Sequence, residues 1–302
     1  MAKIRSSPDM LMMISTLLIL TIGVIMVYSA SAVLAYHDYG DWYYYLKRQL
    51  LFAALGVIAM YVTMNTDYMI WKKYAKVGLI LCFGLLVLVL VPGVGVERGG
   101  AKSWLGIASF GIQPSEFMKL GMIIYMAKLL SEHTDRITLF ARGLLPPLGL
   151  LGLAFGLIML QPDLGTGVVL AGAVLLMIYT AGARILHLSF LGLLGLAGLV
   201  GLILAAPYRL LRITSFLDPW QDPLGSGYQI IQSLYAIGPG GLVGLGLGMS
   251  RQKFNYLPEP QTDFIFSIIA EELGFIGGAT VLVLFLLLVW RGMRTAITAP
   301  DS

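Results

Sequence analysis

The sequence predicts an all-α membrane protein, a polytopic bundle of about eight spanning helices. Two observations carry this prediction. First, 58% of the 302 residues are hydrophobic and only 12% are charged, a composition outside the range of water-soluble domains. Second, apolar residues form blocks close to the length of about 20 that a helix needs to cross a hydrocarbon core of about 30 Å. Because lipid offers no hydrogen-bond partners to open strands or loops, we expect these blocks to be helices.

Eight apolar blocks are the predicted spans. They cover residues 10–35, 49–64, 74–91, 115–130, 143–160, 164–181, 185–206 and 264–290. Lys3 and Arg5 precede the first block, as they would in a cleavable signal peptide. The apolar core of a signal peptide has only about 7 to 15 residues. Since the first block is longer, we expect it to be a retained helix.

The distribution of Lys and Arg predicts the orientation, because short cytoplasmic loops are enriched in these residues. With the amino terminus in the cytoplasm, the inner side carries Lys3, Arg5, Lys72, Lys73, Lys76, Arg136, Arg142, Arg184, Arg291 and Arg294. The short outer loops then carry Lys47, Arg48, Arg98 and Lys102. We therefore expect both termini in the cytoplasm. The net charge of +4 then reflects topology and requires no nucleic-acid partner.

Two extracytoplasmic insertions interrupt an otherwise single membrane domain of residues 1–302. The shorter covers residues 92–114, and the longer, residues 207–263, lies between the seventh and eighth spans. A loop of this length is usually functional or disordered. Apolar and aromatic stretches at residues 228–237 and 254–257 favour re-entrant or interfacial helices instead of disorder.

A glycine-rich run at residues 240–248 resembles a nucleotide-binding loop only superficially. Neither a strand before it nor a Lys-Ser/Thr pair after it is present. We expect a short helix that packs closely through its glycines, and no nucleotide cofactor.

Charged side chains within or beside the spans are the candidates for function, because each costs a few kcal/mol at mid-membrane. Glu116 and Lys119 are three residues apart at the start of the fourth span, so they share a helical face. They form either a structural ion pair or a phosphate-binding site in which Glu116 positions Lys119 or helps to bind a cation. Asp163 either caps the sixth span or contributes to the site.

Three further carboxylates lie at the eighth span. Asp263 begins this span, and its spacing from Ser267 and Glu271 predicts one face that points into the bundle. Function is favoured over structure for Asp263, which has the chemistry of a general base or a cation ligand. We expect Glu271 and Glu272 to be structural, paired with arginines or other polar groups.

Cations collect in the two insertions. They are Arg98, Lys102, Arg209, Arg212, Arg251 and Lys253. Such charges usually form a solvated rim, but here they would face the headgroup layer beside a carboxylate. This arrangement suits a lipid that carries phosphate.

Four sequence runs resemble the SEDS family of shape, elongation, division and sporulation proteins. They are Gly-Ile-Gln-Pro-Ser-Glu-Phe-Met-Lys-Leu at residues 111–120, Gln-Pro-Asp-Leu-Gly-Thr at 161–166, Gly-Tyr-Gln at 227–229 and Tyr-Leu-Pro-Glu-Pro-Gln-Thr-Asp-Phe-Ile-Phe at 256–266. The likeness runs from about residue 8 to the end. The run Met-Val-Tyr-Ser-Ala-Ser at residues 26–31 is most similar to the FtsW and SpoVE branch, not to RodA.

The resemblance implies a peptidoglycan glycosyltransferase that polymerises lipid II on the outer face of the bacterial plasma membrane. It implies that Asp263 is the catalytic residue and that Glu116 and Lys119 contribute to the site. Further substrate-binding candidates are Lys102, Asp163, Arg209, Arg212, Gln229 and Glu259. The implied partners are a class B penicillin-binding protein and other membrane proteins of division or sporulation.

In the implied reaction the donor is an α-linked sugar diphosphate and the product is β-linked, so one inversion with one general base is sufficient. Asp263 would take the proton of the acceptor hydroxyl. Lys119, Arg209, Arg212 or a divalent cation, Mg²⁺ or Mn²⁺, would stabilise the departing undecaprenyl diphosphate. Asp263 and Glu116 are the candidate ligands of such a cation.

The sequence departs from the family pattern at three points. Lys102 and Ser103 stand where the family has two arginines, and Gln261 stands where many members have histidine. The family has ten helices, so we expect this chain to lack the last two. Two other functions are therefore kept open, a lipid II flippase and an inactive scaffold for a penicillin-binding transpeptidase.

Overall fold

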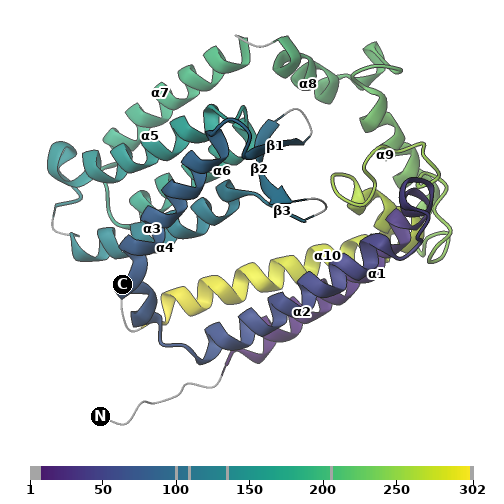
Figure 1. The fold of residues 1–302 in the computed structure, drawn as a ribbon, viewed down its shortest axis with the longest axis horizontal. Coiled ribbons are helices and arrows are strands. Elements are labelled where there is room, and N and C mark those ends of the chain that lie inside the picture. Colours follow the sequence, from purple (N-terminus) through teal and green to yellow (C-terminus); the bar gives the residue numbers. More distant parts are fainter. Residues whose placement is uncertain (1–7, 99–100, 108–109, 134–135, 205–206, 300–302) are drawn as a thin grey trace. The chain divides into compact units, whose positions relative to one another are not determined.

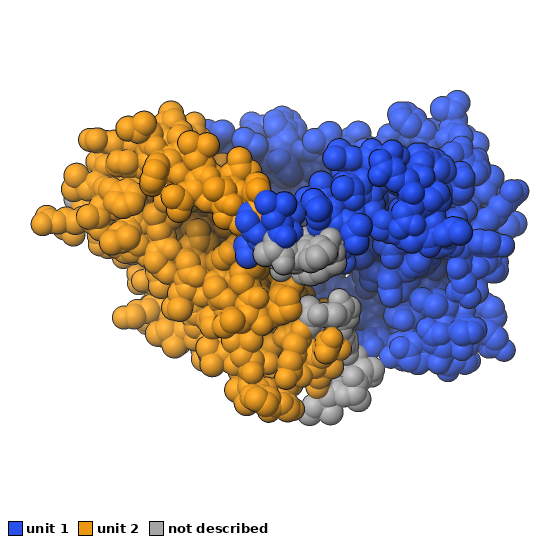
Figure 2. All heavy atoms as spheres, turned by 90° about the horizontal axis from the view of Figure 1, so that it is seen from above, with its two compact units in different colours: residues 1–65, 201–302 blue, residues 66–200 orange. Residues whose placement is uncertain are grey.

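The computed structural model describes residues 8–98, 101–107, 110–133, 136–204 and 207–299 (Figure 1). The chain divides into two compact units, coloured separately in Figure 2. Unit 1 comprises Met1–Asn65 and Gly201–Ser302, and unit 2 comprises Thr66–Val200. Each unit is described by itself below.

The described residues of unit 1 form six helical elements. They are α1 (Met10–Tyr39), α2 (Tyr44–Asn65), α8 (Pro207–Leu217), the short 3₁₀ turn Pro219–Gln221, α9 (Tyr228–Gly240) and α10 (Ile265–Ile297). α1 packs against both α2 and α10, and α9 packs against α10. Met26 and Ala30 of α1 meet Ile268, Ile269 and Val281 of α10 in the core of this unit.

In unit 2 the part of the chain that the structure describes forms five helices, a π-helical turn and a small sheet. They are α3 (Tyr68–Leu90), β1 (Gly95–Arg98), β2 (Ala101–Ile107), β3 (Phe110–Ile112), α4 (Pro114–Glu132), the turn Phe140–Leu144, α5 (Leu145–Met159), α6 (Leu164–Thr180) and α7 (Ile185–Leu204), whose last residues belong to unit 1. Met118, Met122 and Met126 are four apart, so they form one fully buried stripe of α4.

Each predicted span coincides with a helix, α1 to α7 and α10, which confirms a polytopic helical membrane protein. Within the described ranges, six helical stretches are long and apolar enough to cross a bilayer, and α6 is a shorter apolar helix. The 19-residue α4, with Glu116 and Lys119 in its first turns, is not among the six. The number of crossings therefore stays a prediction.

The insertion at residues 92–114 differs from the all-α expectation, because it forms a three-stranded antiparallel sheet in the order β1-β2-β3. Gly95 pairs with Leu105, and Leu105 pairs in turn with Ile112. Short hairpins of this kind satisfy their backbone groups locally, so they form where the apolar spans end.

The insertion at residues 207–263 contains two helices, α8 and α9, and α9 confirms the helix expected at residues 228–237. The expected helix at residues 254–257 is wrong, because this stretch is a series of turns. Its Leu257 is 1% exposed and packs with the α1–α10 core, which attaches the turns to the unit.

α10 is broken at Gly274, although the apolar pattern predicts a continuous helix over residues 264–290. Gly274 has φ of 66° and ψ of −165°, which no helix contains. The glycine-rich run supplies hydrogen bonds across the break: Leu245 N–H to Glu271 O (2.9 Å), Gly246 N–H to Glu272 O (3.0 Å), Phe275 N–H to Gly241 O (2.9 Å) and Ile276 N–H to Leu242 O (3.1 Å). The run is thus a turn inserted at the break, and the helix predicted for it is wrong.

The two long helices of unit 1 are also joined by an ion pair. Asp9 caps α1 and accepts hydrogen bonds from Arg291 of α10, with Arg291 Nε 2.8 Å from Asp9 Oδ2. These Arg291 hydrogen bonds lower the pKa of Asp9 below its ordinary value of 3.8.

We expect this ion pair to give a pH-dependent stability. Because the pKa of Asp9 is lower in the folded protein, its contribution is present above the unfolded pKa and is lost as the pH falls through the folded pKa. The unfolding temperature in detergent should therefore fall between about pH 5 and about pH 2. Asp9→Asn should remove this part of the slope. Equal slopes in the two proteins would contradict the assignment.

Candidate functional site

The first group of candidate residues lies in unit 2, where α4 begins. Pro114 occupies the first turn of this helix, a position that needs no backbone N–H donor. One turn on, Lys119 Nζ is 2.8 Å from Glu116 Oε1, and the side chains are 27% and 53% exposed. An exposed ion pair contributes only about 0 to 1 kcal/mol to stability. The ion pair predicted from the sequence is present, and the side chain of Lys119 is partly exposed.

Asp163 joins the beginning of α6 to the beginning of α4. Its Oδ1 accepts a hydrogen bond from the N–H of Thr166 (3.1 Å), so the predicted helix cap is present. Its Oδ2 accepts a second hydrogen bond from Gln113 Nε2 (3.0 Å), the residue just before α4. Asp163 therefore lies beside the start of α4, the helix that carries Glu116. The capping hydrogen bond by itself is a sufficient structural reason for a carboxylate at this position.

We expect Asp163→Ala to lower the free energy of unfolding by about 1 kcal/mol, because a helix cap is lost. Asp163→Ser is the matched control, since serine keeps a capping oxygen but is too short to replace the contact with Gln113. Thermal unfolding of both variants checks the cap. If Asp163→Ser is stable but binds substrate less well, Asp163 also contributes to the site. Equal stability of the alanine variant and the native chain would contradict the capping role.

Two buried polar atoms near these helix starts escaped prediction from sequence. Ser115 and Gln161 are fully buried, and Ser115 Oγ and Gln161 Oε1 have no hydrogen-bond partner among the described residues. Gln161 Nε2 donates to the carbonyl of Leu86 (3.4 Å). Such atoms need a partner such as water or a ligand. Their only sequence signal is a polar residue next to a proline at the edge of an apolar block.

Lys102 is exposed on β2, a strand that packs against α3 and α4. This position is compatible with the predicted phosphate contact. The side chains of Arg98 and Arg209 fall outside the described part of the structure. Arg212 is exposed on α8, and Gln229 is exposed in the first turn of α9.

The second group lies in unit 1 and centres on Asp263. This residue is exposed in the turn just before α10, which begins at Ile265. The predicted helical face shared with Ser267 and Glu271 is therefore wrong for Asp263, while Ser267 and Glu271 are both buried on α10. Among the described residues no ion pair neutralises Asp263. Its carboxylate is accessible to a substrate.

The turn that leads to Asp263 is held by Glu259. Glu259 Oε2 accepts hydrogen bonds from Gln261 Nε2 (3.1 Å) and Thr262 Oγ1 (3.4 Å). Glu259 has φ of 49°, in the left-handed region that residues other than glycine rarely adopt. Strained turns of this kind are frequent at functional sites. Glu259 thus shapes the turn, in addition to being a candidate for substrate binding.

Glu272 is fully buried and accepts hydrogen bonds from several elements. Lys253 Nζ lies 3.0 Å from its Oε1, and Ser29 Oγ lies 2.7 Å from its Oε2. The backbone N–H groups of Gly248 (2.9 Å) and Ser250 (3.2 Å) donate to the same carboxylate. The predicted structural role of Glu272 is confirmed, with a lysine as its cation. The prediction that Lys253 faces the headgroup layer is wrong, because the residue is only 6% exposed.

Glu271 is bound by the same segment. Its carboxylate accepts hydrogen bonds from Ser250 Oγ (2.6 Å) and from the backbone N–H of Arg251 (2.8 Å). The predicted pairing of Glu271 with polar groups is therefore confirmed. Arg251 contributes through its backbone, while its side chain is exposed.

Few side chains among the described residues could be ligands of a divalent cation. No cluster of three or more His, Cys, Asp or Glu side chains occurs among the described residues. Asp263 and Glu116 each present one carboxylate within their own unit. Mg²⁺ is commonly bound by one or two carboxylates together with substrate phosphates, so each of these carboxylates, taken by itself, is a donor of the kind that Mg²⁺ prefers.

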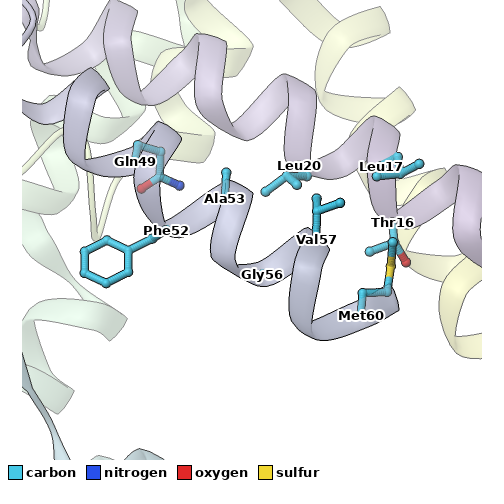
Figure 3. A pocket seen from close by; sticks show the side chains of 9 residues that line it. All are labelled: Thr16, Leu17, Leu20, Gln49, Phe52, Ala53, Gly56, Val57 and Met60. Carbon is cyan, nitrogen blue, oxygen red and sulfur yellow. The ribbon is translucent and has the colours of Figure 1, made fainter. Parts of the chain in front are cut away.

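An open groove between α1 and α2 does not fit polar chemistry (Figure 3). Its lining is apolar except for Thr16 and Gln49. The lining residues are Thr16, Leu17, Leu20, Gln49, Phe52, Ala53, Gly56, Val57 and Met60. The groove carries no titratable group, so we exclude it as a catalytic site.

Comparison with protein families and curated proteins gives a consistent result. Residues 9–302 match the family model for FtsW, RodA and SpoVE, described as cell cycle protein. The chain is 62% identical to the stage V sporulation protein E of Bacillus subtilis (strain 168), over 98% of the chain and 81% of that protein. It is 44% identical to a probable peptidoglycan glycosyltransferase FtsW of Trichlorobacter lovleyi, over 97% of the chain and 77% of that protein.

Solved structures agree with these matches. A chain from a peptidoglycan synthase complex that couples polymerization and crosslinking superposes with a TM-score of 0.76 at 30% identity, covering 97% of this chain and 79% of the other. The rod shape determining protein RodA of Thermus thermophilus superposes with a TM-score of 0.65 at 26% identity, covering 97% and 76%. The higher identity to SpoVE and FtsW than to RodA confirms the branch predicted from residues 26–31.

Proposed function

Because the chain belongs to the FtsW, RodA and SpoVE family of cell cycle proteins, we propose that it is a peptidoglycan glycosyltransferase that polymerises lipid II for septal or spore cell walls. The observation that carries the proposal is the exposed carboxylate of Asp263, without an ion-pair partner among the described side chains. It lies in one of the four sequence runs that resemble the family, residues 256–266.

The proposed chemistry needs one base and one group of cations. Asp263 removes the proton from the 4-hydroxyl of the acceptor sugar as that oxygen attacks the anomeric carbon of the donor. The new glycosidic bond forms as the bond to the diphosphate breaks, and the configuration inverts from α to β. The electron pair leaves with undecaprenyl diphosphate, whose charge is stabilised by Lys119, Arg209 and Arg212.

A divalent cation, when bound, would supply additional positive charge for the diphosphate. Asp263 and Glu116 are the residues of this chain that would hold it. Lys102, Asp163, Gln229 and Glu259 are the further residues proposed to bind the substrate. No nucleotide is required, because loss of the diphosphate drives the reaction.

The proposed setting is the bacterial plasma membrane, with both termini in the cytoplasm and the insertions on the outer face. We propose a class B penicillin-binding protein and other division or sporulation membrane proteins as partners. The likeness to a chain from a peptidoglycan synthase complex supports an assembly in which polymerization and crosslinking are coupled.

The test is a polymerisation assay in detergent. Purified chain with its penicillin-binding partner is given labelled lipid II, and the products are separated by length. Detergent leaves no bilayer to flip across, so glycan polymer supports a transferase. Only unreacted lipid II from the native chain would contradict the proposal and favour a flippase or an inactive scaffold.

A further inference from the structure

We propose that Glu271 and Glu272 act as positioning residues for Asp263, through a buried cluster that fixes the loop carrying it. The cluster consists of Ser29, Ser250, Lys253, Glu271 and Glu272, and is called the carboxylate clamp below. Its link to catalysis rests on the proposed function. Its link to the loop rests on the hydrogen bonds alone.

The clamp binds the loop mainly through backbone groups. Within residues 248–251, three backbone N–H groups donate to the two carboxylates, at 2.9 Å from Gly248, 3.2 Å from Ser250 and 2.8 Å from Arg251. Lys253 closes the turn, because its Nζ donates to the carbonyl of Gly248 (2.6 Å) and to Glu272 (3.0 Å). The conformation of this segment is therefore dictated by α10.

The chain between the clamp and Asp263 has little freedom. Leu257, midway along it, is buried between α1 and α10, and Asp263 is followed within two residues by the start of α10. The loop is thus attached at its beginning, its middle and its end. Loss of the first attachment leaves the start of the loop unfixed, so that the conformation of the turn carrying Asp263 depends on Leu257 and on α10 alone.

Because α10 is broken at Gly274, Glu271 and Glu272 bind the long insertion through their backbone carbonyl groups as well as through their side chains. The carbonyl groups of Glu271 and Glu272 accept hydrogen bonds from Leu245 and Gly246, while their side chains bind the loop that follows. Both the backbone and the side chains of these two residues therefore bind the long insertion.

Stability alone is a poor explanation of the clamp. Burying two carboxylates and a lysine costs several kcal/mol per ion, and apolar residues of similar volume are often as stabilising or more so. What apolar residues cannot do is accept hydrogen bonds from loop N–H groups. This difference favours a positioning role, in which ions specify one loop conformation.

The first test compares two serines of α1. Ser29→Ala removes the hydroxyl that donates to Glu272, whereas Ser31→Ala removes another buried hydroxyl, which donates within α1 to the carbonyl of Val27 (2.6 Å). Hydrogen exchange of residues 248–256 should become about tenfold faster in Ser29→Ala, as expected for a lost hydrogen bond to a charged group. It should change less than about twofold in Ser31→Ala.

The second test separates turnover from binding. Glu272→Gln and Lys253→Met should lower kcat for polymerisation about tenfold or more, because a small misplacement of a catalytic group is costly. KM should change less than about threefold, since the clamp does not touch substrate. Lys253→Arg keeps the charge and should recover part of the loss, which a merely space-filling role would not produce.

Two results would overturn the proposal. One is unchanged exchange of residues 248–256 in a folded Ser29→Ala protein, and the other is a kcat within about twofold of the native value in folded Glu272→Gln. If Glu272→Gln does not fold, Ser29→Ala gives the deciding measurement. The exchange experiment uses no substrate, so the clamp can fail while the glycosyltransferase assignment survives, and the reverse.

Discussion

Asp263→Asn is expected to lower glycan polymerisation by about a hundredfold to ten-thousandfold, the range that a positioned general base contributes. Asparagine has nearly the same shape but cannot take a proton from the acceptor hydroxyl. The exposed Asp263 has no ion-pair partner among the described side chains, so the fold should be unaffected. The initial rate of polymer formation from labelled lipid II measures the activity. A thermal unfolding scan of the same sample checks that the fold is unchanged.

The matched control for this substitution is Asp38→Asn. Asp38 is also an exposed carboxylate of unit 1, and its Oδ1 lies 2.8 Å from Nδ1 of the neighbouring His37. The same chemical change there should leave the rate within about twofold. Native rates for Asp263→Asn would exclude Asp263 as the base, even if polymer formation itself is confirmed.

Gly274→Ala is expected to prevent or severely weaken assembly of unit 1. Alanine at a positive φ costs about 1 to 2 kcal/mol by itself. The added methyl group would also overlap the backbone of Leu242 and Gly244, which cannot move without losing the hydrogen bonds across the break. A loss of several kcal/mol should appear as reduced yield of folded protein and a lower unfolding temperature.

Gly292→Ala provides the control, because Gly292 lies in the same helix with open space around its missing side chain. Replacing a helical glycine there should stabilise by about 0.5 to 1 kcal/mol. Gly244→Ala should behave like Gly274→Ala, since its methyl group would overlap the carbonyl of Glu272. Equal stability of the Gly274 and Gly292 variants would show that the break is not required.

The helices could be predicted from the sequence because apolar blocks of spanning length have no alternative in lipid. The break at Gly274 could not. The segment around Gly274 is as apolar as an unbroken helix, and the non-helical angles are stabilised by a run that lies some thirty residues earlier in the chain. The sheet at residues 95–112 was missed because its strands are short and rich in glycine.

In the candidate site, too, contacts between residues close in sequence could be predicted, whereas contacts between residues far apart in sequence could not. The pair Glu116–Lys119 and the cap by Asp163 follow from spacing within a few residues, and both are present. The clamp joins Ser29 to Glu272, which are separated by 243 positions, so no periodicity could reveal it. Asp263 could be identified from the sequence run, but its place in a turn before α10 required the structure.

The two polar connections between α1 and α10 have a mechanical consequence. One joins Asp9 to Arg291 and the other joins Ser29 to Glu272. Along α1 the two connections are 20 positions apart (29 − 9), which is about 30 Å at 1.5 Å per residue and close to the thickness of the hydrocarbon layer. A slide of one helix along the other by a single turn, about 5.4 Å, would separate both pairs at once. The two polar connections therefore fix the axial register of the antiparallel helices α1 and α10.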